Sequence, residues 1–119
     1  MKRDGLPPAA QLDAAARLFE ALAHPVRLQI VIGLLSGECC VGPMVECLGL
    51  PQPLVSRHLG ILRDAGVVDA VAVGRQRVYR VVHPAVPGLI TYLHSGVFPT
   101  PESIPRMFTP GASHALPID

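Results

Sequence analysis

The spacing of hydrophobic residues changes once along this chain, at Val67, and this change most constrains the fold. Before Val67 apolar residues recur at helical spacing, in segments separated by proline or glycine. From Val67 to Val73 they alternate with other residues, and a second apolar run covers Val78–Val82. We therefore expect a β-hairpin with a polar tip at Gly74, Arg75 and Gln76, and a last helix from the His83-Pro84 region to Leu93. A start of this helix only after Pro87-Gly88 is the alternative. The helices expected before the hairpin cover residues 11–23, 25–35, 41–48 and 52–64.

The composition fits one compact domain without a membrane span. The chain has 119 residues, half of them hydrophobic, and a formal net charge of +1. No stretch has the roughly 18 uninterrupted apolar residues of a spanning helix, and the N-terminus has no apolar signal core. We expect an N-terminal arm over residues 1–10, a folded domain over 11–96 and a proline-rich, extended tail over 97–119. The expected location is the cytoplasm, where the three cysteines would stay reduced.

The positive charge is concentrated in the second half of the expected domain. Residues 52–80 hold five arginines and two aspartates, a balance of +3, whereas the rest of the chain carries −2. The order of the expected elements is that of a winged helix-turn-helix. It consists of a short helix, a tight turn at Gly49-Leu50-Pro51, a helix with a polar face and a basic hairpin. The sequence therefore predicts a mainly α fold with a small β-hairpin (α+β) and a partner of duplex DNA.

Several segments resemble the ArsR/SmtB family of bacterial winged-helix repressors, over roughly residues 12–95. The resemblance implies a homodimer joined by its first and last helices, which binds an inverted-repeat operator as two half-sites. The segments are LAHPVRLQIV at 22–31, GE at 37–38, QPLVSRHLGILRDAGVV at 52–68, and GR to YR at 74–80.

The resemblance also predicts which residues contact DNA. Gln52, Ser56 and Arg57 match the reading helix, and Arg63 adds to its positive charge. Arg75, Gln76 and Arg77 match the tip of the wing. Pro51 stands where the family usually has Ser, so this helix should lack a side-chain N-cap. We expect His58 to pack or form an internal hydrogen bond, and a solvated helix face is the alternative interpretation of Arg57 and Arg63.

Histidines near the last helix are candidate metal ligands, because the family places a metal site on this helix across the dimer. On one continuous helix His83 and His94 would project nearly the same way while standing about 16 Å apart. Two antiparallel copies could pair His83 of one chain with His94 of the other, and His114 of the tail could add a ligand. Nitrogen ligands suit Ni²⁺, Zn²⁺ or Co²⁺. The register differs from that of the family by about two residues, and the family's carboxylates are missing.

The cysteines form a second candidate sensor. Cys40 matches the first cysteine of the family's thiol motif, but Gly42 replaces the second, so the soft-metal site is incomplete. Cys47 on the same helix would lie about 10 Å from Cys40, and we expect it to be a small buried side chain. The vicinal pair Cys39-Cys40 could respond to an oxidant or to sulfide.

These observations lead to a metal-responsive DNA-binding regulator, with two alternatives. One is a regulator that senses oxidant or sulfide through Cys39 and Cys40. The other is a winged-helix interaction module that binds a partner protein, and a second subunit could also complete the metal site. No motif predicts an enzyme, since the chain has no Gly-rich phosphate loop, no Cys-x-x-Cys pair and no carboxylate dyad near a histidine.

Overall fold

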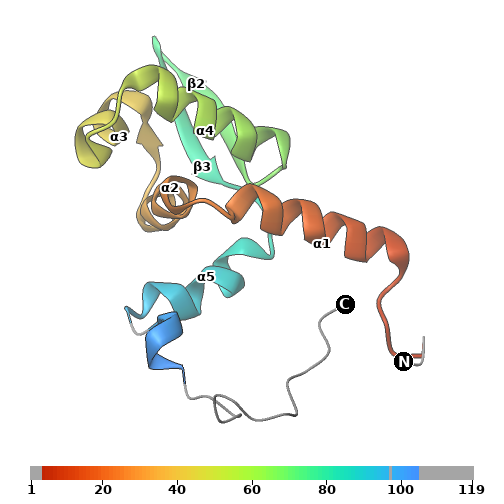
Figure 1. The fold of residues 1–119 in the computed structure, drawn as a ribbon. Helices are drawn as coiled ribbons and strands as arrows, with labels where there is room; N and C mark the ends of the chain where they lie inside the picture. Colours follow the sequence, from red (N-terminus) through yellow and green to blue (C-terminus); the bar gives the residue numbers. More distant parts are fainter. Residues whose placement is uncertain (1–3, 97, 105–119) are drawn as a thin grey trace.

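The computed structural model describes residues 4–96 and 98–104. Five helices, a three-stranded antiparallel sheet and one short 3₁₀ turn follow one another in this part of the chain (Figure 1). The elements are α1 (Ala9–Leu22), α2 (Pro25–Ser36), β1 (Cys39–Cys40), α3 (Val41–Leu48), α4 (Gln52–Asp64), β2 (Val68–Val73), β3 (Gln76–Val81), α5 (Val86–His94) and η1 (Pro101–Ser103). The predicted α+β fold and the order of its helices are confirmed.

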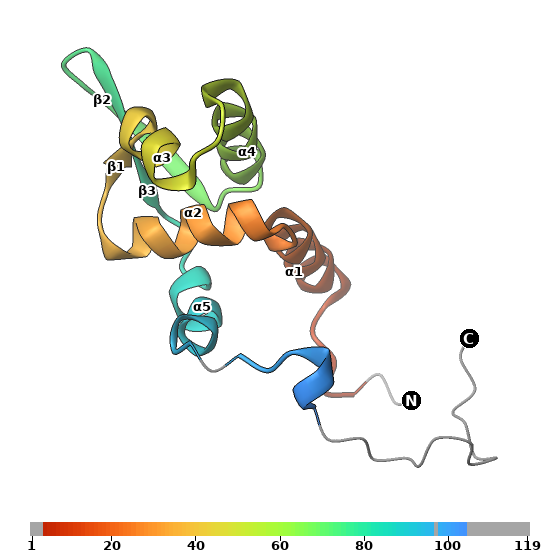
Figure 2. The ribbon, with the colours of Figure 1, turned by 60° about the vertical axis from the view of Figure 1, so that its left-hand side comes forward.

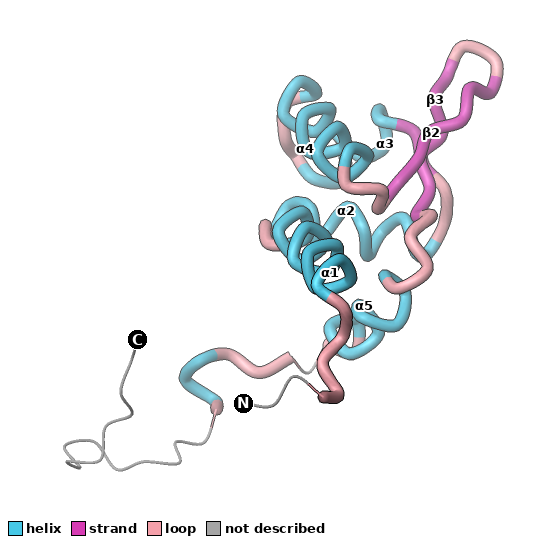
Figure 3. Tube along the Cα trace, turned by 90° about the vertical axis from the view of Figure 1, so that its right-hand side faces the viewer, coloured by secondary structure: helices cyan, strands magenta, loops and turns pink. Residues whose placement is uncertain are grey.

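Helix α2 forms the centre of the fold. It lies between α4 on one side and α5 on the other, and α1 crosses at its N-terminal end (Figures 1 and 3). Val31 of α2 is fully buried, and Ile30 and Leu34 flank it in the core. The most deeply buried large side chains, at most 2% exposed, come mainly from α2, α4 and the start of the wing; they are Leu59, Leu62, Val31, Val55, Val67, Val68 and Val86. The core therefore holds α4 rigidly by one face.

The turn between α3 and α4 depends on one glycine. Gly49 adopts a φ of 65°, and its N–H donates to the carbonyl of Val45, which closes the end of α3. Only glycine adopts this left-handed conformation without steric strain. Leu50 and Pro51 then lead directly into α4, so the predicted tight turn between these two helices is confirmed.

The hairpin projects beyond the helices (Figure 2). Strands β2 and β3 pair from Val68↔Val81 to Val73↔Gln76, which leaves a turn of two residues, Gly74 and Arg75. The prediction of a three-residue tip was wrong, because Gln76 already belongs to β3. Gly74, with a φ of 63°, allows a turn of only two residues.

Other boundaries also differ from the prediction. A short strand, β1, was not predicted and pairs with β3 through Cys39↔Tyr79 and Cys40↔Val78. Helix α5 begins at Val86, one residue before Pro87, because the first turn of a helix tolerates proline. Within the predicted extended tail, Thr100 and Ser103 cap the 3₁₀ turn η1. No single helix among the described residues has the length and hydropathy to cross a membrane, and α1 with α2 meets that test only as a pair bent by 97°.

Candidate nucleic-acid interface

Helix α4 presents two chemically different faces. Val55, Leu59 and Leu62 are at most 1% exposed and attach the helix to the core. Gln52, Ser56 and Arg57 are exposed on the remaining surface, and none of the side-chain hydrogen bonds or ion pairs given for the described residues involves their side chains. Leu54 is 38% exposed because it lies in the first turn, at the edge of the apolar stripe. The outward face of α4 is therefore polar, with Arg57 as its cation.

The first turn of α4 has no side-chain cap. Pro51 occupies the N-cap position, and only its backbone carbonyl serves the turn, by accepting from the N–H groups of Leu54 and Val55. The missing N-cap follows from the proline, as predicted. Pro53 has no N–H, so Gln52 supplies the N–H of this first turn that has no partner among the hydrogen bonds of the described residues and could bind an anion such as a phosphate.

The hairpin carries the second group of cations. Arg75 in the turn and Arg77 on β3 are exposed. Gln76 lies between them, and its Oε1 accepts a hydrogen bond of 3.3 Å from the thiol of Cys40 on β1. A hydrogen bond thus ties the wing, beside its turn, to the cysteine strand, while Arg75 and Arg77 are exposed to solvent.

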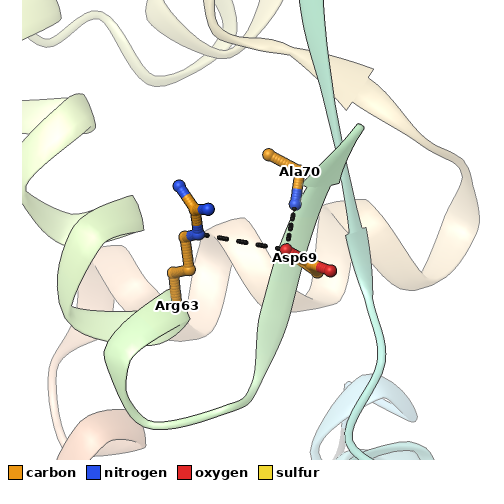
Figure 4. A network of polar contacts seen from close by, with 3 residues as sticks. All are labelled: Arg63, Asp69 and Ala70. Carbon is orange, nitrogen blue, oxygen red and sulfur yellow. Dashed lines mark hydrogen bonds and ion pairs between the residues drawn. The ribbon is translucent and has the colours of Figure 1, made fainter. Parts of the chain in front are cut away.

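Arg63 is engaged differently from Arg57. Its Nε lies 3.9 Å from Oδ1 of Asp69 on β2, and the same oxygen accepts from the N–H of Ala70 (Figure 4). Both charged side chains are about half exposed, so the ion pair contributes little to stability, about 1 kcal/mol or less. Arg63 therefore links the end of α4 to the base of the wing.

A cluster of His24, Arg27 and His58 lies on the inward side of α4. His58 is 6% exposed, and its Nδ1 lies 3.3 Å from a terminal guanidinium nitrogen of Arg27 on α2. The rings of His24 and His58 have their centroids 4.5 Å apart. Burial, followed by His24, Arg27 and Arg57, lowers the pKa of His58. The internal role predicted for His58 is confirmed, whereas the contribution of Arg27 was missed.

The cysteines lie near the wing and near α3. Cys39 and Cys40 form β1, and the thiol of Cys39 donates to the carbonyl of Cys40. Cys47 was predicted to be buried, but it is exposed: it lies one turn after the buried Met44, and with Met44 it lines an open cavity beside α3. Cys39 and Cys47 line a cavity of about 380 Å³ between α2, β1 and α3. Cys40 lines another, of about 260 Å³, together with Gln76 and Arg77.

The candidate metal ligands are not assembled in the described part of the chain. His83 precedes α5 instead of belonging to it, so the predicted placement of His83 and His94 on one continuous helix is wrong. The cause is the sequence His83-Pro84, after which the helix starts only at Val86. The side chain of His94 and all of His114 lie outside the described residues. Among residues 4–96 and 98–104, no three His, Cys, Asp or Glu side chains are grouped to hold a metal ion.

Large apolar side chains are exposed on α1 and α5. They include Leu12 at 49% and Phe19 at 54% on α1, and Leu89 at 44% and Tyr92 at 59% on α5. Tyr92 also contacts Phe98 edge to face, with ring centroids 5.7 Å apart. Exposed apolar patches of this kind on two helices are typical of an interface with another protein chain.

Comparison with known proteins points to one family. Residues 24–70 match the model described as "Bacterial regulatory protein, arsR family". The HTH-type transcriptional repressor SmtB of Mycobacterium tuberculosis is 51% identical over 74 residues, which cover 62% of this chain and 55% of the repressor. The chain thus matches about half the length of that relative. The probable mercury resistance operon repressor of Streptomyces lividans is 41% identical over 83 residues, 70% of this chain and 66% of the repressor.

Two solved structures share the fold. The homodimeric winged helix-turn-helix DNA-binding domain Mb0332 from Mycobacterium bovis has a TM-score of 0.67 and 32% identity, covering 78% of this chain and 88% of that one. Reduced HlyU from Vibrio cholerae N16961 has a TM-score of 0.70 and 32% identity, covering 74% of this chain and 93% of that one. The winged helix-turn-helix fold predicted from the order of elements is confirmed.

Proposed function

This chain belongs to the arsR family of bacterial regulatory proteins, which are transcriptional regulators and not enzymes, and we propose that it binds duplex operator DNA as a homodimer. Helix α4 enters the major groove, and the hairpin β2–β3 contacts the neighbouring backbone. The observation that carries this proposal is the division of α4. One face is locked into the core by Val55, Leu59 and Leu62, and the other offers Arg57 beside the exposed arginines of the wing.

The exposed apolar side chains of α1 and α5 support the homodimer. A two-fold pairing through Leu12, Phe19, Leu89 and Tyr92 would bury them and would leave α4 and the wing free. The solved domain from Mycobacterium bovis is itself homodimeric. Two reading helices related by a two-fold axis match an inverted repeat with half-sites about one helical turn apart.

Duplex binding tests the proposal directly. A labelled duplex of about 30 bp, selected from a random library with this protein, is titrated at several salt concentrations. We expect salt-dependent binding that weakens in Arg57→Ala and in Arg75→Ala. Arg17→Ala is the matched control, because Arg17 is an exposed arginine of α1 paired with Asp13. Binding that is absent, or insensitive to salt, would favour the interaction module instead.

A thiol signal has a direct structural route to the wing. The thiol of Cys40 donates to Gln76, and both line one cavity with Arg77. Oxidation of Cys40 would remove this thiol donor, and oxidation of either cysteine would alter β1, which pairs with the strand that carries Arg77. Peroxide, which oxidises the thiol to a sulfenic acid with release of water, or sulfide added together with peroxide, which converts that sulfenic acid to a persulfide with release of water, should then change operator affinity in the wild type and leave that of Cys39→Ser/Cys40→Ser unchanged. An equal response of both proteins would exclude these thiols as the sensor.

A divalent metal ion, Ni²⁺, Zn²⁺ or Co²⁺, is the other proposed signal. It rests on relatives such as the mercury resistance repressor and on pairing His83 with His94 of a second copy, with His114 as a further ligand. His83 fits this role poorly, since its Nδ1 accepts a hydrogen bond of 3.1 Å from the N–H of Ala85. This bond leaves the ring proton on Nε2, so coordination through Nε2 would require the other tautomer and loss of the bond.

Calorimetry separates the two signals. The purified protein is titrated with each of the three metals and compared with His83→Ala/His94→Ala and Cys39→Ser/Cys40→Ser. Loss of stoichiometric binding only in the histidine variant would support the site at the last helix. Loss only in the cysteine variant would move the metal to the thiols. No binding by any of these proteins would reject metal as the signal.

A further inference from the structure

The cluster of His24, Arg27 and His58 joins three helices at one point. Arg27 of α2 donates from Nε to the carbonyl of Ala21 and lies 3.5 Å from the carbonyl of Glu20 with its second terminal nitrogen, so it binds the end of α1. Its other terminal nitrogen lies 3.3 Å from Nδ1 of His58 on α4. A single guanidinium therefore connects the last turn of α1 to the middle of α4.

The connection requires His58 to be neutral. A guanidinium is always protonated and can only donate, so Nδ1 of His58 must accept. His24 is held the same way, because its Nδ1 accepts from the N–H of Val26 at the start of α2. Protonation of His58 at Nδ1 would replace the acceptor by a donor that faces Arg27, and two cations would then be in contact.

The charged groups around the cluster reinforce this effect. On its own helix His58 follows Arg57, from α2 it faces Arg27, and before α2 it faces His24; all three disfavour its cationic form. Arg27 lines a cavity of about 420 Å³ together with Arg17, Glu20 and Asp64. Within the described residues, neither of the two ion pairs given involves Arg27. No carboxylate is among the groups that shift the pKa of His58.

The cluster connects two surfaces that the proposed function uses. Arg57 faces outward from α4, whereas the next residue, His58, enters the cluster. Arg27 binds backbone carbonyls in the last turn of helix α1. The same helix carries the exposed side chains of Leu12 and Phe19. Resting on the proposed function, we propose that Arg27 and His58 are positioning residues for DNA binding. They set the angle of α4 relative to the dimer-forming helix α1, and protonation of His58 weakens operator binding.

General electrostatics predicts the opposite pH dependence. Acidification charges histidines and makes the protein more positive, which strengthens its attraction to DNA phosphates. Weaker binding at low pH therefore requires a specific structural cause. The sign of the pH effect on affinity distinguishes a positioning role from a general effect of charge.

The experiment measures Kd for the selected duplex of about 30 bp at about pH 7.5 and about pH 5.5. For the wild type we expect binding to weaken about tenfold on acidification, in line with the usual size of coupling between two sites. In His58→Asn the amide oxygen accepts from Arg27 in place of Nδ1 but cannot be protonated, so affinity should stay constant or increase at low pH. Arg27→Met should bind weakly at both pH values, and Arg17→Gln, the matched control on α1, should behave as the wild type.

Three results would overturn the proposal: tighter wild-type binding at low pH, a His58→Asn variant that weakens as much as the wild type, or an Arg27→Met variant that is folded and binds normally. Circular dichroism shows whether Arg27→Met is folded, and the pH comparison of the wild type with His58→Asn does not depend on that variant. Absence of salt-dependent binding at about pH 7.5 would instead refute the proposed function.

Discussion

Two leucines on α4 provide a matched test of how this helix is anchored. Leu59 is 1% exposed and packs in the core, whereas Leu54, five residues earlier, is 38% exposed. Leucine and alanine are both good helix formers, so the change to alanine alters helix propensity little at either position. The difference between Leu59→Ala and Leu54→Ala therefore reports burial.

The expected magnitudes follow from that burial. Truncation of a buried leucine removes its transfer free energy and leaves a cavity, which costs about 2–5 kcal/mol. Leu54→Ala should cost about 1 kcal/mol or less, because part of the side chain already contacts water. With an m-value of about 2 kcal/mol/M in urea, Leu59→Ala should lower the unfolding midpoint by about 1–2.5 M.

The assay is urea unfolding followed by circular dichroism, at equal protein concentration because dimerisation contributes to apparent stability. The m-value should stay constant in both variants. Equal losses in Leu54→Ala and Leu59→Ala would refute the assignment of the inward face of α4.

Three further changes test separate features of the fold. Gly49→Ala should destabilise the protein by about 1–2 kcal/mol because of its positive φ, whereas Gly33→Ala, in the open surface of α2, should stabilise it by about 0.5–1 kcal/mol in the same urea assay. The free energy of unfolding should fall as the pH falls below the ordinary histidine pKa. The cause is the lowered pKa of His58 in the folded protein, because of which the unfolded chain binds the proton at a higher pH than the folded one. The dependence of the free energy of unfolding on pH should therefore be smaller in His58→Asn. Arg63→Ala should cost about 1 kcal/mol or less at low salt and nothing measurable in about 1 M salt, since its pair with Asp69 is half exposed.

The elements could be predicted because their signals are local. The apolar spacing of each helix, the prolines at their starts and glycines such as Gly49 and Gly74 act within a few residues, and these helices and turns appear close to their predicted places. Errors at boundaries arose where two neighbouring signals compete, as at Val86, where a helix starts just before Pro87.

The contacts of the candidate site could not be predicted, because they join residues far apart in the sequence. Arg27 meets His58 across 31 positions, and Cys40 meets Gln76 across 36. Strand β1 has only two residues and is defined by its pairing with β3, so no alternation in the sequence reveals it. Exposure of Cys47 depends on which side of α3 meets the core, which a helix of eight residues with few polar side chains does not reveal.

The salt dependence of duplex binding by Arg75→Ala tests whether the wing and α4 form a DNA-binding surface. If the wing arginine contacts a phosphate, each homodimer of the variant loses two such contacts, and each contributes about 0.9 to the slope of log K against log salt. We expect the slope to become shallower by about 1.8 in Arg75→Ala and to stay unchanged in Arg17→Ala. An unchanged slope in Arg75→Ala, or wild-type binding without salt dependence, would contradict the assignment of the wing and α4 as a DNA-binding surface.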